Sequence, residues 1–361
     1  MLWTKIMSKV AIITDLHFGA RGDAITFVDY MDKFYTNTFF PTLQERGIKT
    51  ILNLGDTFDR RKYINYNSLK RSRQMFFDPI RDNGMIMHML AGNHDTYYKN
   101  TNDTNSIDLL LNEYSNINVM AEACDLTVDG RKIFMLPWIC SDNYEQSMER
   151  MTDTDAEICM GHLEIAGFVM HRGVKSHGGL NAERFRKFGL VYSGHYHHRN
   201  NDGHIYYLGN PYELTWADYK DPRGFHIWDT ETMELEFIQN PYTMFERVEY
   251  DDVTNDYTDY DPSIMKEKYV KVIVNNKSDF KKFDDFMKKI YKANPHDVRI
   301  LEDFAEFQDG EIDEELNLED TMNILTSYVD SVETTLDKEK ITGFLRGLYA
   351  EAQQLESETS E

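Results

Sequence analysis

The sequence contains seven side chains that can bind divalent metal ions, each at or just after the end of a short apolar run. Their donor groups are carboxylate, amide and imidazole, which divalent cations in phosphoester chemistry accept. A pair of such cations can activate water and neutralise the charge on a phosphate. The pattern therefore predicts a two-metal phosphoesterase. The seven residues are Asp15, His17, Asp56, Asn93, His162, His195 and His197.

These residues occur in five short motifs whose local geometry suits metal binding. Asp15 and His17 stand two apart at the end of a predicted strand, so their side chains point the same way. Asp56 follows an apolar run at a turn, where one carboxylate can bridge two ions roughly 3.5–4 Å apart. Any single motif is common in proteins without metal, but all five in this order favour a metal centre. The motifs are Asp15-Leu16-His17, Gly55-Asp56, Gly92-Asn93-His94-Asp95, Gly161-His162 and Gly194-His195-Tyr196-His197.

Strands that end at one edge of a sheet are needed to bring these motifs together. Short apolar runs alternate with amphipathic stretches up to about residue 240. Strands separated by helices are typical of an α/β domain whose helices cover the sheets, and the closely spaced last strands indicate an antiparallel addition. Predicted strands cover residues 10–14, 50–54, 85–90, 132–136, 157–160, 190–193, 205–208, 224–228 and 234–238. Predicted helices cover residues 24–46, 66–83, 104–114 and 181–187.

The pattern changes after Pro241, where a smaller module begins. Two β-like runs, 269–274 and 297–301, flank a helical stretch at 279–292. This order predicts a compact β-α-β module within residues 241–302.

An acidic linker, residues 303–318, separates this module from two helices predicted within residues 319–357. Both helices carry apolar residues at helical spacing, so each has one apolar face. Two interpretations stay open: the helices pack back on the same chain, or they dock on a partner protein. We favour docking, because a helix pair behind an acidic linker has little core of its own to cover.

The net charge of −23 is unevenly distributed, with −7 over residues 1–240 and −16 over residues 241–361. Residues 60–73 run against this trend, with six basic side chains and no acidic one. The local field matters more than the total charge for binding a polyanion. The strip is either a solvated helix face or a phosphate-binding surface, and its place directly after a metal motif favours the second.

Composition sets the remaining limits on the class of protein. A chain of 361 residues with 41% hydrophobic and 13% aromatic residues is that of a folded protein with more than one domain. Three cysteines without CxxC spacing indicate reduced thiols rather than disulfides. The sequence shows neither a membrane-spanning run nor a secretory signal, so we expect a cytoplasmic protein.

The motif order DxH, GDxxD, GNHD, GH and GHxH resembles the calcineurin-like metallophosphoesterases. Within them it is similar to the SbcD branch, the nuclease subunit of a double-strand-break repair complex, and especially to its bacteriophage recombination endonucleases. Segments 136–138, 173–178 and 221–225 also look like that phage group. Over residues 8–240 the resemblance implies an α/β fold in which a β-sandwich is flanked by helices (αββα).

The resemblance continues more loosely beyond the first domain. Residues 241–302 resemble a capping domain for DNA, and residues 319–357 resemble the segment that docks on a partner ATPase. It implies an SbcC-like ATPase of the SMC/ABC type as partner, DNA as substrate and a homodimer. The implied activities are exonuclease on DNA ends and endonuclease on single-stranded or hairpin DNA, in recombination, repair and replication.

The resemblance also implies roles for the motif residues. His94 would stabilise the transition state or protonate the leaving oxygen during in-line attack by a metal-bridged water, with Asp95 orienting its ring. Manganese is the expected ion, with magnesium also possible. One ion would be held by Asp15, His17, Asp56 and His197, and the second by Asp56, Asn93, His162 and His195. The expected DNA contacts are Arg60, Arg61, Lys62, Arg71 and His177.

Two other functions stay open. The first is a phosphoprotein or small-molecule phosphatase, because the run from Asp56 to Arg60 matches the GDxxDR motif of protein phosphatases. Against it, Arg61 stands where they have glycine and Asp95 where they have glutamate. The second is a non-catalytic scaffold, which the presence of all seven ligands together with His94 disfavours.

Overall fold

A computed structural model of the protein describes residues 9–171 and 174–302, together with Val329 and Lys338. The chain divides into two units, residues 1–302 and 303–361, and every element reported below lies in the first. The predicted acidic linker and terminal helices therefore lie outside the described residues, apart from Val329 and Lys338. Among the described residues, no helix combines the length and the apolar character needed to cross a bilayer.

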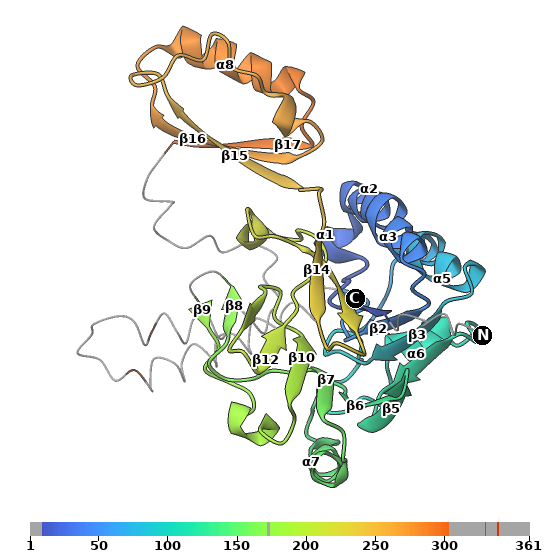
Figure 1. Ribbon diagram of the computed structural model, residues 1–361. Helices are drawn as coiled ribbons and strands as arrows, with labels where there is room; N and C mark the ends of the chain where they lie inside the picture. Colours follow the sequence, from blue (N-terminus) through green and yellow to red (C-terminus); the bar gives the residue numbers. More distant parts are fainter. Residues whose placement is uncertain (1–8, 172–173, 303–328, 330–337, 339–361) are drawn as a thin grey trace, which may run out of the picture. The chain divides into compact units, whose positions relative to one another are not determined.

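Two six-stranded sheets form the larger part of the first unit (Figure 1). In the first sheet four parallel strands are followed at one side by an antiparallel pair. Its order is β14 (Leu235–Gln239), β13 (Gly224–Asp229), β1 (Lys9–Ile13), β2 (Thr50–Asn53), β3 (Ile86–Leu90) and β4 (Ile117–Met120). The predicted antiparallel addition is thus the pair β13 and β14.

The second sheet also has a parallel centre, with one antiparallel strand at each edge. Its order is β11 (Asn200–Asn201), β12 (Ile205–Tyr207), β10 (Leu190–Gly194), β7 (Ile158–His162), β6 (Arg131–Leu136) and β5 (Cys124–Val128). The edge strands β4 and β5 were not predicted, because their residues are only partly buried and their apolar signal is weak.

The two sheets pack face to face, and each is covered by helices on its other face. Successive side chains of a strand point to opposite faces, so a strand covered on both sides is apolar throughout. Val10 and Ile12 of β1 meet Ile133 and Met135 of β6 in the core between the sheets. Ala11, between Val10 and Ile12, belongs instead to the core under the helices. The αββα sandwich predicted from the sequence is confirmed.

The two long helices predicted at 24–46 and 66–83 are each interrupted by a π-helical turn. Pro41 and Pro79 lie at the start of the helix that follows each π turn. Proline has no N–H to donate and its ring clashes with the carbonyl four residues earlier, so a wider turn lets the helix continue past it. The segments are α2 (Ile25–Phe34), η1 (Tyr35–Phe39) and α3 (Phe40–Glu45), then α4 (Tyr66–Ser72), η2 (Arg73–Phe77) and α5 (Asp78–Asp82).

The other elements of this part are short. Helix α7 was not predicted, because only Ser147 and Met151 of its ten residues are buried and the rest are mostly polar. The helix predicted at 181–187 is a 3-10 turn, η3. These elements are α1 (Ala20–Asp23), α6 (Ser106–Leu111), α7 (Tyr144–Asp153), β8 (Val169–His171), β9 (Val174–Lys175), η3 (Ala182–Phe185) and η4 (Trp216–Asp218). The 3-10 turn η5 (Ser263–Met265) belongs to the smaller module that follows.

Residues 245–301 form a separate three-stranded parallel sheet covered by one helix. The elements are β15 (Phe245–Asp251), β16 (Tyr269–Asn276), α8 (Phe280–Lys292) and β17 (Asp297–Leu301). The side chain of Asp279 caps α8 by accepting from the N–H groups of Lys281 and Lys282, and Phe286 and Ile290 pack into a core of their own. The predicted β-α-β order is present, with β15 added in front. The assignment of this module as a DNA cap stays a prediction.

Glu213 connects the start of β15 to the larger part of the unit. Its buried carboxylate accepts hydrogen bonds from the backbone N–H groups of Met244, at 2.6 Å, and Phe245, at 3.0 Å. The Phe245 ring packs against Trp216 with 4.7 Å between centroids. Burial raises the pKa of Glu213 to about 7, although the two backbone donors act to lower it.

This raised pKa predicts a pH-dependent contribution of Glu213 to stability. The folded chain keeps a proton on Glu213 that the unfolded chain releases near pH 4.5. The stabilisation is therefore complete below that pH and is lost as the pH rises to about 7, by roughly 3 kcal/mol in all. The glutamine side chain of the variant Glu213→Gln resembles the protonated acid, so the unfolding free energy of the variant should fall less over this range. Denaturant titrations between about pH 5 and about pH 8 measure the difference.

The exposed glutamate Glu231 provides the control, since Glu231→Gln should keep the wild-type pH dependence. Parallel pH profiles for wild type and Glu213→Gln would contradict the assignment.

Candidate metal centre

The predicted ligands follow the carboxyl ends of five parallel strands. Three of these strands, β1, β2 and β3, belong to the first sheet, and β7 and β10 belong to the second. Because the strands run in the same direction within each sheet, their ends meet at one edge of the sandwich. The seven ligands predicted from the sequence are all brought together there.

The loop after β1 carries Asp15 and His17 in a constrained backbone. Both residues have left-handed conformations, with φ of 55° and 44°. Such conformations cost free energy for residues other than glycine and persist where surrounding contacts impose them. The N–H of Asp15 donates to the Gly55 carbonyl and the N–H of His17 donates to the Asp56 carbonyl, each at 3.0 Å. The loops after β1 and β2 are thus held together by their backbones.

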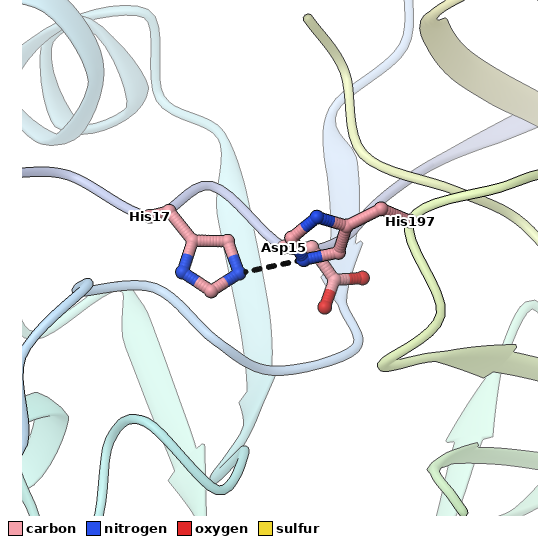
Figure 2. A group of neighbouring side chains, drawn as sticks. All are labelled: Asp15, His17 and His197. Atoms are coloured by element: carbon pink, nitrogen blue, oxygen red, sulfur yellow. Dashed lines mark hydrogen bonds between the residues drawn. The ribbon is translucent and has the colours of Figure 1, made fainter. Parts of the chain in front are cut away.

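His197, 180 residues further along the sequence, lies beside this loop (Figure 2). Its Nε2 lies 3.0 Å from Nε2 of His17, and the ligand atoms of Asp15, His17 and His197 lie within 4.8 Å of one another. Asp15 is also tied to the same loop, because its carboxylate accepts the N–H of His195 at 3.0 Å. Two imidazoles and a carboxylate from opposite ends of the domain converge on one point.

Asp56 lies between the two halves of the site. Its Oδ2 is 3.8 Å from Nε2 of His17 and 3.3 Å from Nε2 of His162. Its other oxygen accepts the N–H of His94 at 2.8 Å. Asp56 is almost fully buried and has a left-handed φ of 52°. This is the position that a bridging carboxylate needs.

The second half of the site is centred on the Asn93 amide. Its Oδ1 lies 2.9 Å from Nε2 of His162 and 3.0 Å from Nδ1 of His195. The opposite nitrogen of His162 lies 2.8 Å from the Leu54 carbonyl, which orients the ring. The Trp138 indole packs on His195 with 5.2 Å between ring centroids. No local motif predicted these roles for Leu54 and Trp138, although Trp138 is part of the segment that resembles the phage group.

Two glycines let the ligand loops approach each other this closely. A Cβ at Gly92 would lie 2.2 Å from Oδ1 of Asp56, and a Cβ at Gly194 would lie 2.1 Å from the Thr14 hydroxyl. Both distances are far shorter than any real contact. Glycine at these positions is therefore required by packing as well as by turn geometry.

His94 lies at the edge of the site and is oriented differently from our expectation. Its Nδ1 is 2.5 Å from the Asp59 carbonyl oxygen. The Asp95 carboxylate instead accepts the backbone N–H groups of Thr57, at 3.0 Å, and Gly92, also at 3.0 Å. The expectation that Asp95 orients the His94 ring is thus corrected: Asp95 binds backbone N–H groups of the two ligand loops, and the Asp59 carbonyl holds the ring. The reason is that Asp95 is fully buried among N–H groups that need an acceptor.

Asp59 has a second contact in the site. Its carboxylate Oδ1 lies 3.2 Å from Nδ1 of His17, on the side of the ring opposite to the ligand nitrogen Nε2. A carboxylate in this position fixes the orientation of a metal-binding imidazole and raises its basicity. Through its carbonyl and its carboxylate, Asp59 thus orients the rings of both His94 and His17.

The neighbouring carboxylates favour the protonated form of two histidines. Burial lowers the pKa of His17, but the contact of its ring N–H with the accepting Asp59 carboxylate and the charge of Asp56 outweigh it and raise that pKa to about 9. Burial likewise lowers the pKa of His162, but Asp56 raises it to about 9. Burial and the charge of His162 lower the pKa of His195 to about 3.

The carboxylates respond to the same charges. Burial raises the pKa of Asp56, but the charges of His162 and His94 outweigh it and hold the pKa well below its usual value. For Asp15, burial dominates and its pKa is raised. Burial and the charge of Asp56 raise the pKa of Asp95 to about 6. A buried group of carboxylates and imidazoles is stable only when cations balance the charge.

The donor set fits divalent ions. It combines carboxylate oxygen, amide oxygen and imidazole nitrogen, and its members converge from two sheets with nitrogen atoms as close as 3.0 Å. Such ions, when bound, acidify water and neutralise charge on a phosphate. The residues within 4.8 Å of one another form three overlapping groups, namely Asp15 with His17 and His197, His17 with Asp56 and His94, and Asp56 with His162 and His195.

The basic strip is less available for phosphate than the sequence indicated. Arg60 lies 2.8 Å from Asp23, and Arg71 lies 2.8 Å from Asp29. These ion pairs satisfy the guanidinium groups within the chain, because acidic residues of α1 and α2 face the strip. Lys62 and His177 are exposed, and Arg61 is partly buried.

This fold and donor set define a metal-dependent phosphoesterase. Residues 8–199 match the calcineurin-like phosphoesterase family. The chain belongs to that family, and the resemblance predicted from its motifs is confirmed.

Similarity to individual proteins extends beyond the family match. The chain is 31% identical over 315 residues to Exonuclease subunit 1 of Enterobacteria phage T4, which covers 86% of this chain and 90% of the phage protein. The solved structure of an archaeal phosphodiesterase is 13% identical and covers 64% of this chain and 99% of that chain, with a TM-score of 0.33. A dimetal phosphatase from Danio rerio is 12% identical and covers 66% and 97%, with a TM-score of 0.41. The predicted likeness to a phage nuclease subunit is confirmed by the first of these.

Proposed function

We propose that the protein is a two-metal DNA nuclease, acting as an exonuclease on DNA ends and as an endonuclease on single-stranded or hairpin DNA. The observation that carries this proposal is the similarity along most of the chain to a protein named as an exonuclease subunit. The proposed setting is DNA recombination, repair and replication, in the cytoplasm of the host cell.

The ligands divide into two sets that share Asp56. We assign Asp15, His17, Asp56 and His197 to one ion, since the first, second and last of these converge within 4.8 Å. We assign Asp56, Asn93, His162 and His195 to the other, which the contacts of the Asn93 amide support. Manganese is the proposed ion, and the oxygen and nitrogen donors also admit magnesium.

His94 is the proposed acid of the reaction. The Asp59 carbonyl accepts a hydrogen bond from Nδ1–H, so Nε2 is the nitrogen through which His94 acts. In the protonated ring, Nε2–H donates to the oxygen that leaves phosphorus and so balances its developing charge. Asp95 supports this step indirectly, because it holds the backbone of the loop that carries Asn93 and His94.

The test is a comparison of substrates with manganese present. Cleavage of single-stranded and hairpin DNA should exceed hydrolysis of a phosphate monoester at equal concentration of enzyme. Efficient monoester hydrolysis with no cleavage of DNA would replace the proposal by the phosphatase alternative. The absence of both activities in a protein that binds manganese would favour the scaffold.

Lys62 is the basic side chain best placed for phosphate contact. It is exposed and follows the bridging Asp56 by six residues, whereas Arg60 and Arg71 already pair with aspartates. Lys62→Ala should weaken DNA binding at every sequence and reduce the slope of log affinity against log salt by about 0.7–0.9, the value for one phosphate. Arg71→Ala should change the slope less.

Titrations of labelled DNA at several salt concentrations, without divalent ions, measure both slopes. An unchanged slope for Lys62→Ala would refute the phosphate contact. Arg61 and His177 stay proposed contacts of lower rank.

The proposed assembly contains more than this chain. The word subunit in the name of the phage relative supports a complex, and we propose an SbcC-like ATPase as the partner bound by residues 319–357. A homodimer through the helices after the second and third metal motifs completes the proposal. Residues 319–357 lie outside the described residues except Val329 and Lys338.

A further inference from the structure

Two backbone carbonyls beside the ligands of one proposed ion are held by side chains from another segment. The first is the carbonyl of His197, which accepts a hydrogen bond from Nη1 of Arg223. The same Nη1 donates to Oδ1 of Asn210. Arg223 is only 4% exposed, so its guanidinium is buried and forms its hydrogen bonds inside the protein. It belongs to a sequence segment, residues 221–225, that the proposed reaction does not otherwise use.

Arg223 is itself held rigidly. Its Nη2 donates to Asp218 at 2.7 Å and to Asp221 at 2.8 Å. The second oxygen of Asp218 accepts the backbone N–H groups of Leu214 and Thr215, at 2.8 and 2.9 Å. A planar guanidinium with two carboxylates on one nitrogen and two oxygens on the other has little freedom to move.

The second carbonyl is that of Leu16, between Asp15 and His17. It accepts a hydrogen bond of 2.5 Å from the hydroxyl of Tyr212, a fully buried residue. Tyr35 lies 3.3 Å from the same hydroxyl and completes its hydrogen bonding. The backbone N–H of Asn210 donates to the His197 carbonyl at 3.4 Å, and Tyr212 is two residues further on, so one short segment contacts both carbonyls.

We propose that Arg223 and Tyr212 are positioning residues for the ion assigned to Asp15, His17 and His197. A hydrogen bond to a carbonyl fixes the peptide plane from which the neighbouring side chains project. Nε2 of His17 and Nε2 of His197 lie 3.0 Å apart, although their loops are 180 residues apart in the sequence. Hydrogen bonds from a third segment to the backbones of both loops hold the two rings at that distance. Outer partners of this kind typically change metal affinity by roughly tenfold to a hundredfold. This inference rests on the ligand sets of the proposed function.

The effect should be confined to one ion. The other set is oriented by different groups, namely the Leu54 carbonyl beside His162 and the Trp138 ring beside His195. A general loss of folding stability would weaken both ions equally. Unequal loss therefore separates positioning from a merely structural role.

The experiment uses the full chain with Tyr212→Phe and Arg223→Lys. Phenylalanine keeps the shape of the tyrosine and removes one hydroxyl, while lysine keeps the charge and loses the fork that reaches two acceptors. Tyr114→Phe and Arg131→Lys are the matched controls. In the wild type the Tyr114 hydroxyl donates to Asp78 and the Arg131 guanidinium donates to the Thr230 carbonyl, both away from the metal ligands. Manganese binding is followed by calorimetry and by electron paramagnetic resonance.

We expect wild type and controls to bind two manganese ions that give a spin-coupled signal. Each test variant should bind one ion as tightly as wild type and the other roughly tenfold to a hundredfold more weakly. At the manganese concentration that fills both sites of the wild type, the electron paramagnetic resonance spectrum of the variant should be that of isolated, uncoupled manganese. Two tight ions in both variants, or equal weakening of both ions, would overturn the inference while leaving the proposed function intact. A wild-type protein that binds no pair of ions would instead contradict the proposed function.

Discussion

Asp56→Asn should abolish manganese-dependent cleavage of DNA and prevent the two ions from binding as a pair. An Asp56 oxygen lies 3.8 Å from Nε2 of His17 and 3.3 Å from Nε2 of His162, the two ends of the proposed centre. Asparagine keeps the size and one acceptor oxygen but loses the charge that draws cations to both positions. Cleavage should fall on the order of a thousandfold or more, since charge neutralisation at phosphorus depends on both ions.

The measurement pairs cleavage rates with manganese stoichiometry on the same preparations. Asp129→Asn is the matched control, because Asp129 also has a left-handed φ, of 49°, but lies in an exposed turn. Asparagine tolerates that conformation as aspartate does, so the control isolates the loss of charge at the site. Near-normal cleavage by Asp56→Asn would contradict the proposal that a pair of ions bridged by Asp56 is required for activity.

His94→Ala should give the second large effect, with a different signature. The variant should bind both ions as wild type does, because His94 is outside the two proposed ligand sets, and cleave DNA roughly 10²- to 10⁴-fold more slowly. The physical reason is the loss of the proton donor that the Asp59 carbonyl holds in place. Single-turnover rates together with manganese titrations distinguish this result from that of Asp56→Asn.

A substrate with a better leaving group tests the proposed role directly. A nitrophenyl phosphodiester releases an anion that needs no proton, so the defect of His94→Ala should shrink on it. His204→Ala, which removes an imidazole bound to the Phe188 carbonyl, serves as control. An equal defect on both substrates would show that His94 is not the acid. Loss of manganese by His94→Ala would show that it is a ligand.

The residues that converge at the strand ends could be predicted from the sequence because metal chemistry restricts the donor types. Aspartate, asparagine and histidine behind apolar runs and glycines are uncommon together, and parallel strands necessarily end at one edge. The same runs predicted an α/β domain whose helices cover the sheets, while the resemblance to the metallophosphoesterases implied the αββα sandwich. The weakly apolar edge strands β4 and β5 and the polar helix α7 did not, since their burial depends on neighbours distant in the chain.

The charged residues illustrate the opposite case. Residues 60–73 look like an open basic strip, yet Arg60 is paired with Asp23 and Arg71 with Asp29. Asp95 looks like the partner of His94, yet it binds backbone N–H groups. A long side chain can reach many acceptors, and which one it takes depends on distances that no local pattern contains.

By itself, then, the sequence determined the donor chemistry, the strand ends that present it and the layers that cover it, because these depend on residue type and on short periodicity. Only the tertiary structure decided which imidazoles face each other, as His17 and His197 do at 3.0 Å, and which side chains hold their backbones. Such contacts join segments as far as 196 residues apart, as between Tyr212 and Leu16. Their geometry is set by how two sheets pack, and packing is a property of the whole chain.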